Sequence, residues 1–285
     1  MSQLRPALID QPALALKRKR AAPGAARFLA DTARDELQER LIDVNRVFTK
    51  PALITPLGAF WQGFLPAAPR IAPGEALAIT PGAHDLVIHA LALHWAEDPV
   101  GQIVQASRGL SPDGLFLAVC LGGETLQELR ASLGQAEAEI TGGMSPRVAP
   151  MAEIRDLGQL LGRAGLALPV ADTLRQTASY PDLHALARDL RAMGETNALA
   201  ARLRRPTRRA VFARAAEIYA ANYPAPNGRI TATFDLMFLA GWRPHASQQK
   251  PLRRGSAATR LSEALHTDEF DETGAPVLDP AALRR

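Results

Sequence analysis

The stretch DLVIHALALHW at residues 85–95 and the stretch LFLAVCL at residues 115–121 decide the fold. Each contains a continuous apolar run without the alternation of a half-exposed strand, which predicts a strand buried on both faces. Helical patterns follow at about 98–109 and at about 124–140. Because parallel strands are joined through helices that cover the sheet, the sequence predicts an α/β fold with a mainly parallel sheet and helices on both faces.

The periodicity of apolar residues predicts further elements on either side of this centre. In chain order they are a helix at 28–46, a strand at 52–55, a helix at 151–164, a strand at 170–178, helices at about 181–193 and 207–223, and a last strand at 230–240. The two helices before the last strand form a predicted helical insert at about 181–224.

The ends of the chain differ from this centre in composition. Residues 1–27 are rich in Pro and Ala and carry the basic run at 17–20, which predicts a flexible, solvated segment. Residues 258–285 are acidic with little to bury, which predicts a mobile tail. We therefore expect one domain at 28–257 between these two segments.

Composition excludes several classes of protein. Hydrophobic residues make up 47% of the 285 residues, enough for a sizeable core. Cys120 is the only cysteine, so disulfide frameworks and Cys-based zinc sites are excluded. His84, His184 and His266 lack partners at metal-ligand spacing, so we expect no metal site. No apolar run approaches the length of a membrane span, although peripheral membrane contact stays open.

Positive charge is unevenly distributed along the chain. Residues 1–50 and 151–285 carry net charges of +4 and +5, whereas residues 51–150 carry −5. Basic flanks are consistent with an anionic partner or with codon bias. No aromatic residues interleave with the basic runs, so we expect no binding to nucleic acid.

Several motifs together resemble a known family. The stretch at 85–95, together with Asp98 and the turn LSPDG at 110–114, resembles part of the class I methyltransferases, which use S-adenosylmethionine (SAM). In those proteins the matching part is strand four, its helix and the turn into strand five. The motifs that narrow the resemblance are GGETLQELR at 122–130, GGMSP at 142–146, MGETN at 193–197, GWRPH at 241–245, SQQKP at 247–251 and GSA at 255–257. Over about residues 9–257 the chain is similar to the family of mitochondrial complex I assembly factor five and its bacterial relatives, which is related to the methyltransferase of biotin synthesis.

The resemblance implies a Rossmann-like, SAM-binding fold and a bacterial, cytoplasmic protein that acts in the assembly of respiratory complex I. For the mitochondrial member it implies hydroxylation of an arginine on a complex I subunit. The implied partner is therefore a complex I subunit or an assembly intermediate.

The predicted SAM site departs from the family pattern. The turn after the first strand keeps only Gly58 and Gly63 and places bulk at Phe60 and Trp61, where backbone should approach the cofactor closely. No acid that could bind the ribose hydroxyls lies between Gly63 and Glu75. Only 21 residues separate Gly63 from Asp85, fewer than one βαβ crossover needs, so the fold is expected to be shortened between strands one and four.

Candidate site residues follow the ends of the central strands, where open α/β sheets bind ligands. Trp95 could stack on a ligand and His94 could donate a hydrogen bond, or both could be packed core residues. Gly122 and Gly123 permit close approach of a ligand or form a tight turn. The candidate SAM-binding residues are Gly58, Gly63, Glu75, His94, Trp95, Gly122 and Gly123; no catalytic residue is assigned.

Two polar stretches are candidates for a partner or substrate surface. The first is an arginine cluster at a predicted helix start, where cations oppose the helix dipole and so do not serve to stabilise the helix. The second is the polar loop after the last strand. The candidate residues are Arg204, Arg205, Arg208, His245, Gln248 and Lys250. A solvated face is the alternative for both.

Three functions stay open from the sequence. The first is a SAM-dependent enzyme that modifies a protein substrate during complex I assembly. The second is a non-catalytic, methyltransferase-like assembly factor, a pseudoenzyme that has lost SAM binding. The third is a small-molecule methyltransferase. The departures at the SAM site favour the second function over the first. The C-terminal motifs, which resemble the assembly factor family, disfavour the third.

Overall fold

The computed structural model describes residues 7–22, 27–56 and 58–249. The chain divides into two compact units, Met1–Ala246 and Ser247–Arg285. The fold below is that of the first unit. The predicted tail at 258–285 and Lys250 lie outside the described residues.

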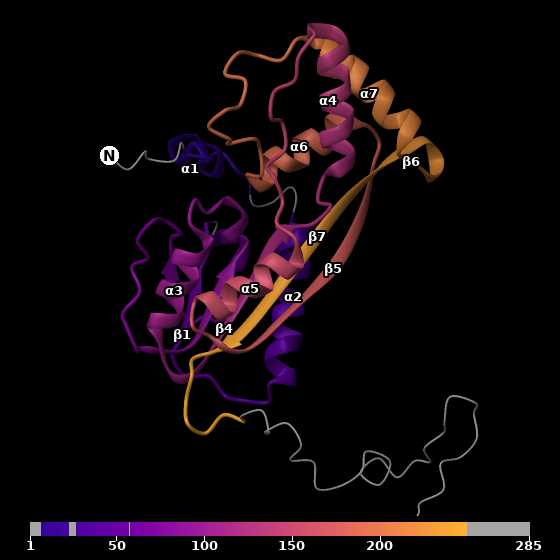
Figure 1. Ribbon diagram of the computed structural model, residues 1–285. Coiled ribbons are helices and arrows are strands. Elements are labelled where there is room, and N and C mark those ends of the chain that lie inside the picture. The colour runs from indigo at the N-terminus through magenta and orange to yellow at the C-terminus, as the bar shows by residue number, and fades with distance from the viewer. Residues whose placement is uncertain (1–6, 23–26, 57, 250–285) are drawn as a thin grey trace, which may run out of the picture. The chain divides into compact units, whose positions relative to one another are not determined.

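One mixed sheet organises the first unit (Figure 1). Its strands are β1 (Pro51–Ile54), β2 (Arg70–Ile71), β3 (His84–Ala90), β4 (Leu110–Gly122), β5 (Ala167–Tyr180), β6 (Pro224–Ala225) and β7 (Arg229–Trp242). They run in the order β2-β1-β3-β4-β7-β5, with β6 paired to β7. The first four strands are parallel, and β7 is antiparallel to both of its long neighbours. The predicted, mainly parallel sheet is confirmed.

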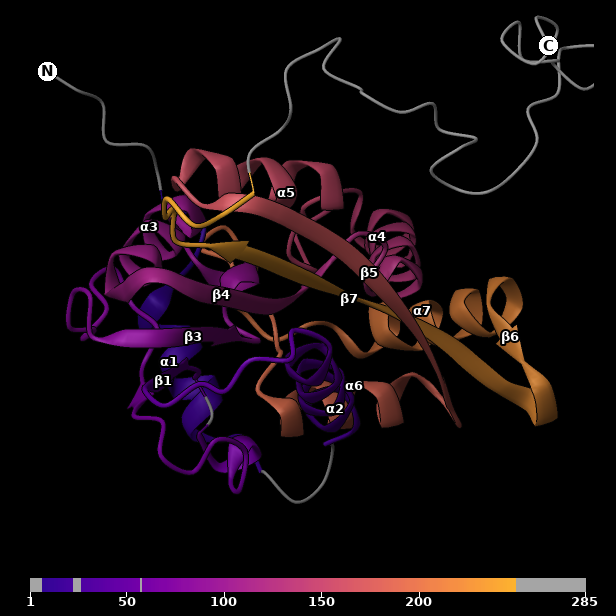
Figure 2. The same cartoon turned by 90° about the horizontal axis from the view of Figure 1, so that it is seen from below.

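Helices cover both faces of this sheet (Figure 2). One face packs against α2 (Phe28–Asp43), α4 (Gln127–Thr141), α6 (Leu183–Met193) and α7 (Arg209–Asn222). The other face packs against α3 (Pro99–Gly109) and α5 (Ile154–Arg163). Since β4 is buried at every residue from 114 to 122, its apolar run has the double-sided burial that the sequence predicts.

The connection from β1 to β3 is short, as the sequence predicts. Within its described residues it contains the 3-10 turn η1 (Gly58–Trp61) and the two residues of β2, but no α-helix. Phe60, Trp61 and Phe64 are buried and join the core cluster that includes Leu29 and Leu37 of α2. These aromatic side chains therefore take the place of a helix against this part of the sheet.

Two local features differ from the expectations. The predicted turn at 110–114 is an irregularity inside β4, where the pairing shifts from His84–Leu110 to Leu86–Leu115 and Asp113 has a φ of 61°. Residues 11–19, within the segment predicted to be flexible, form α1 (Gln11–Lys19). The Asp10 side chain caps this helix through the N–H of Ala13, and Leu14 is buried. The short apolar pattern of α1 explains why periodicity missed it.

His89 on β3 is completely buried, and its Nε2 lies 2.7 Å from Oε1 of Gln102 on α3. Burial lowers the pKa of His89 to about 4 from its ordinary value of 6.5. Between these two pH values the unfolded chain binds a proton that the folded chain does not. This group therefore destabilises the fold as the pH falls from about 6.5 to about 4.

We predict that His89→Gln flattens the fall in stability between pH 7 and pH 5. Near the lower limit the histidine contributes up to about 1.4 kcal/mol per pH unit to the free energy of unfolding. Urea denaturation at a series of pH values measures the slope. The exposed His184 provides the control, because His184→Gln should leave the slope unchanged; equal slopes for wild type and His89→Gln would contradict the account.

Candidate functional site

The carboxyl ends of β1, β3 and β4 meet at one edge of the sheet, where α/β folds bind ligands. Three cavities lie around this edge, and each is named for a neighbouring element: the β1 cavity, the α6 cavity and the α1 cavity. Their volumes are about 30, 190 and 470 Å³, respectively. The predicted site residues are distributed among these cavities or lie outside them.

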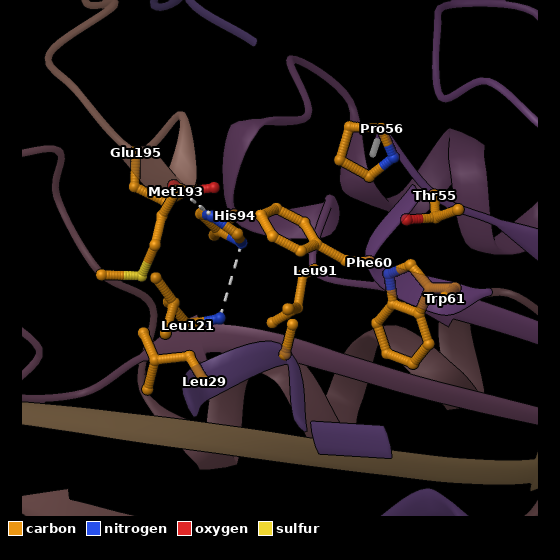
Figure 3. A pocket seen from close by; sticks show the side chains of 11 residues that line it. Leu29, Thr55, Pro56, Phe60, Trp61, Leu91, His94, Leu121, Met193 and Glu195 are labelled. Atoms are coloured by element: carbon orange, nitrogen blue, oxygen red, sulfur yellow. Dashed lines mark hydrogen bonds and ion pairs between the residues drawn. The ribbon is translucent and has the colours of Figure 1, made fainter. Parts of the chain in front are cut away.

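The β1 cavity lies where the sequence predicts the cofactor (Figure 3). Phe60 and Trp61 line it and are 4% and 1% exposed. In Figure 3 the Phe60 ring points towards His94. The remaining space of about 30 Å³ suits one or two water molecules, whereas sites for small-molecule ligands measure roughly 300–1,000 Å³.

The residues beside β1 therefore do not fit SAM. A Cβ added at Gly58 would meet no protein atom within 4 Å, and Gly58 does not line the β1 cavity. Gly63, with a φ of 81°, provides a turn and also faces open space. Glu75 is exposed and lines the α1 cavity rather than the β1 cavity.

Gly122 and Gly123 end β4 in close contact with protein atoms. A Cβ at Gly122 would lie 2.9 Å from the carbonyl oxygen of Ala152 and would overlap the Met237 side chain. A Cβ at Gly123, whose φ is 53°, would lie 2.6 Å from an Asp235 carboxylate oxygen. The geometry gives both glycines a packing role in the turn.

We predict that Gly122→Ala lowers the free energy of unfolding by about 1–3 kcal/mol, because the added methyl group overpacks this turn. Gly58→Ala is the matched control and should change stability by less than about 0.5 kcal/mol, since space is open there. Chemical denaturation of both variants measures the difference. Equal effects at the two positions would contradict the packing role.

His94 and Trp95 lie in η2 (Leu93–Trp95), directly after β3, and both bind Glu195. The Nε2 of His94 lies 3.0 Å from Glu195 Oε2, and the indole N–H of Trp95 donates to the same oxygen at 2.6 Å. The backbone N–H of Leu121 donates to His94 Nδ1 at 3.5 Å, so Nε2 carries the proton towards Glu195. The two predicted residues thus converge on a carboxylate from the loop after α6.

Glu195 is a buried carboxylate, with 14% of its side chain exposed. Burial alone would raise its pKa, but the interactions with His94, Arg18 and Trp95 outweigh burial and hold the pKa below its ordinary value. Glu195 is therefore ionised at neutral pH. Glu195 lies in the MGETN motif at 193–197, but the sequence alone indicates no site role for it.

The α6 cavity lies on the side of this cluster that faces the helical insert. Its wall is mostly apolar, and polar groups from His94, Glu195, Arg147, Arg191, Thr196 and Asn197 join it. At about 190 Å³ it is smaller than most small-molecule sites. Its size suits one long side chain.

The loop that walls the α6 cavity is held in place by Glu137 of α4. This carboxylate accepts hydrogen bonds from the Ser145 N–H at 3.0 Å and from Arg147 Nε at 3.1 Å. Arg147 Nη1 also donates to Thr207 Oγ1 at 2.7 Å. Ser145 of the GGMSP motif therefore positions the wall rather than touching a ligand.

The predicted partner residues of the first unit do not line the three cavities. Arg204 pairs with Asp10 at 3.4 Å, and 69% of its side chain is exposed. Arg205, Arg208 and His245 are exposed, whereas Gln248 is half-buried and lies in the C-terminal unit. Among the residues that the structure describes, no group of three or more His, Cys, Asp or Glu could hold a metal ion, and no helix could span a membrane.

The strand order, the parallel centre and the antiparallel β7 define a methyltransferase-like, Rossmann-like α/β fold. The chain is 44% identical over 187 residues to a protein of Dictyostelium discoideum named mitochondrial arginine-hydroxylase NDUFAF5, a match that covers 65% of this chain and 43% of that one. It is 35% identical over 181 residues to a malonyl-[acyl-carrier protein] O-methyltransferase of Laribacter hongkongensis, which covers 64% and 58%. These relatives confirm the predicted resemblance.

Two further proteins are similar to parts of the chain. The zebrafish arginine-hydroxylase NDUFAF5 is 40% identical over 199 residues, 70% of this chain and 62% of that one. A methyltransferase-like crystal structure from Bacillus halodurans aligns at 13% identity with a TM-score of 0.46, covering 73% of this chain and 98% of that one. No protein-family model matches. The chain spans about half the length of the curated relatives that it matches.

Proposed function

We propose that the chain acts in the assembly of respiratory complex I as a methyltransferase-like protein that binds a protein partner and no longer binds SAM. The observation that carries this proposal is the β1 cavity, which Phe60 and Trp61 reduce to about 30 Å³. The resemblance to complex I assembly factor five supplies the assembly role. The bacterial cytoplasm stays the predicted location.

The packing around β1 supports the loss of SAM binding. Trp61 is 1% exposed and belongs to the core cluster that includes Leu53 and Leu86 of the sheet. Moving it aside to admit a cofactor would expose a large apolar surface, which costs several kcal/mol. A methyltransferase acting on a protein or on a small molecule would need SAM binding to offset this free-energy cost.

The α6 cavity is the proposed site for a side chain of the partner, and its chemistry favours arginine. Glu195 places an ionised carboxylate at the edge of a mostly apolar cavity, and the contacts of His94 and Trp95 both fall on Oε2. A guanidinium forms charge-assisted hydrogen bonds with such a carboxylate. The name of the arginine-hydroxylase relatives is consistent with an arginine ligand.

In this arrangement the residues of the chain bind and orient the partner's arginine. Desolvation by the apolar wall strengthens the ion pair with Glu195. His94 and Trp95 fix the carboxylate by their hydrogen bonds, so the carboxylate is preorganised before the partner arrives.

We predict that isothermal titration of the full chain with SAM gives no binding in the micromolar range, because the β1 cavity cannot hold an adenosine. A dissociation constant at or below the micromolar range, about −8 kcal/mol of binding free energy, would contradict the proposal. Such a result would restore the SAM-dependent enzyme as the preferred function.

The partner proposal predicts that Glu195→Gln weakens capture of complex I subunits or assembly intermediates from the native cell by about tenfold or more, since a charge-assisted pair is lost. The control is Glu153→Gln, which removes the same charge at an exposed position without a side-chain cap bond. Quantitative pull-down with both variants measures the effect. The proposal fails if wild type recovers no such proteins or if both variants bind equally.

A further inference from the structure

A groove lies on the other side of the loop that walls the α6 cavity, and it has a volume of about 380 Å³. Residues 146–151 line one hollow or the other, and Val148 lines both. Of the two hollows, Pro146 and Pro150 line only the groove, whereas Arg147 lines only the α6 cavity. We call the groove the proline groove. A single stretch of chain therefore separates it from the proposed site of the partner's arginine.

The lining of the proline groove is apolar except for one arginine. Its charged residue is Arg130, and its larger apolar residues are Leu8, Pro146, Val148, Pro150 and Leu199. Leu8 is 50% exposed, so the groove is open to solvent. A contiguous apolar surface that stays open to water marks an interaction site. The groove therefore suits an apolar group of a partner.

Hydrogen bonds hold together the chain segments that form the groove. The N–H of Ala200 donates to the Leu8 carbonyl at 2.9 Å, which joins the N-terminal segment to the loop after α6. From the same loop, the side-chain amide of Asn197 donates to the Pro146 carbonyl at 2.7 Å. The groove is thus formed before a partner arrives, so little further ordering opposes binding.

Arg130 of α4 places a positive charge at the groove. Its Nη2 donates to the Ala149 carbonyl at 3.0 Å, and the residue is exposed. Within the described residues, no Asp or Glu forms an ion pair with this arginine. A guanidinium has several N–H donors, so donors remain for a carboxylate from outside. The groove therefore offers an apolar surface beside a cation.

Three motifs of the family resemblance end at this groove. GGETLQELR ends at Arg130, GGMSP at Pro146 and MGETN at Asn197. These residues are distant in sequence, and the shared lining and the hydrogen bond between Asn197 and Pro146 bring them together. None of the three lines the β1 cavity. The motifs therefore meet at a surface that is separate from the predicted position of the cofactor.

We propose that the proline groove binds the same partner segment whose arginine enters the α6 cavity, and that this segment carries an aliphatic side chain and a carboxylate close to that arginine. The aliphatic side chain packs against Leu8, Val148 and Leu199, and the carboxylate pairs with Arg130. Because the two hollows share a wall, a short extended segment, at roughly 3.3 Å per residue, reaches both. The identity of the segment rests on the proposed function.

The test selects peptides from a random phage-displayed library with the immobilised full chain, so it needs no known partner. We expect the selected peptides to share an aliphatic residue and an acidic residue within a few positions of an arginine. Fluorescence anisotropy then measures the affinity of a selected synthetic peptide. The affinity should fall by about tenfold or more in Leu8→Asp and in Arg130→Gln, because each variant removes one of the proposed contacts.

Leu16→Asp and Arg155→Gln are the matched controls. Leu16 of α1 is 48% exposed, close to the 50% of Leu8, and Arg155 of α5 is exposed like Arg130. Neither control residue lines the proline groove. Both controls should bind the peptide like wild type, and thermal unfolding checks that all four variants are folded.

Three results would overturn the proposal. The first is a selection that yields no binding peptide, and the second is equal affinity of the peptide for wild type and the two groove variants. The third is a wild-type dimer in sedimentation that Leu8→Asp dissociates, since a second copy would then be the occupant.

Glu195→Gln separates this proposal from the proposed function. A peptide whose binding depends on Glu195, but not on Leu8 or Arg130, supports the arginine site in the α6 cavity and contradicts the groove. A peptide whose binding depends on Leu8 and Arg130, but not on Glu195, supports the groove and contradicts the arginine site.

Discussion

Every part of a parallel sheet must be covered on both faces, and here the chain between β1 and β3 is too short to supply a helix. Aromatic side chains of η1 and the following turn meet that requirement. Phe60, Trp61 and Phe64 pack with α2 against the sheet and belong to the main core. Burying three large aromatic groups is a strong stabilising contribution. The same packing fills the space beside β1, so the way the sheet is covered determines the chemistry left at its edge.

With that space filled, the polar groups of the edge lie around Glu195. His94 and Trp95, directly after β3, converge on this carboxylate. The neighbouring Gly194 packs against Arg18 of α1. The three cavities therefore differ in character. The β1 cavity is nearly filled. The α6 cavity is mostly apolar, with the carboxylate of Glu195 and the side chains of Arg147 and Arg191 in its wall. The α1 cavity is lined by several polar side chains, including Arg18. The proposed partner site follows from these differences.

The sequence predicts most of the fold because long apolar runs, such as 115–121, leave little choice of structure. The shortened connection was also predictable from the residue count between Gly63 and Asp85. The site was harder to predict from the sequence than the fold. The position of His94 and Trp95 after a strand marks them as candidates, but Glu195 lies about a hundred residues away and contacts them only in the folded structure. Arg18 belongs to a basic run that the sequence predicts to be solvated, since nothing local indicates that its guanidinium is buried. Gly122 and Gly123 show the reverse case, in which a pattern typical of ligand binding serves packing.

The central claim is that buried aromatic side chains occupy the place where SAM would bind. A crystal structure of the full chain, grown with SAM in large excess, tests it most directly. The account predicts that Phe60 and Trp61 stay packed against α2 and the sheet, with no cofactor density beside Gly58. Density for SAM at that position, with the Trp61 side chain displaced from the core, would contradict it.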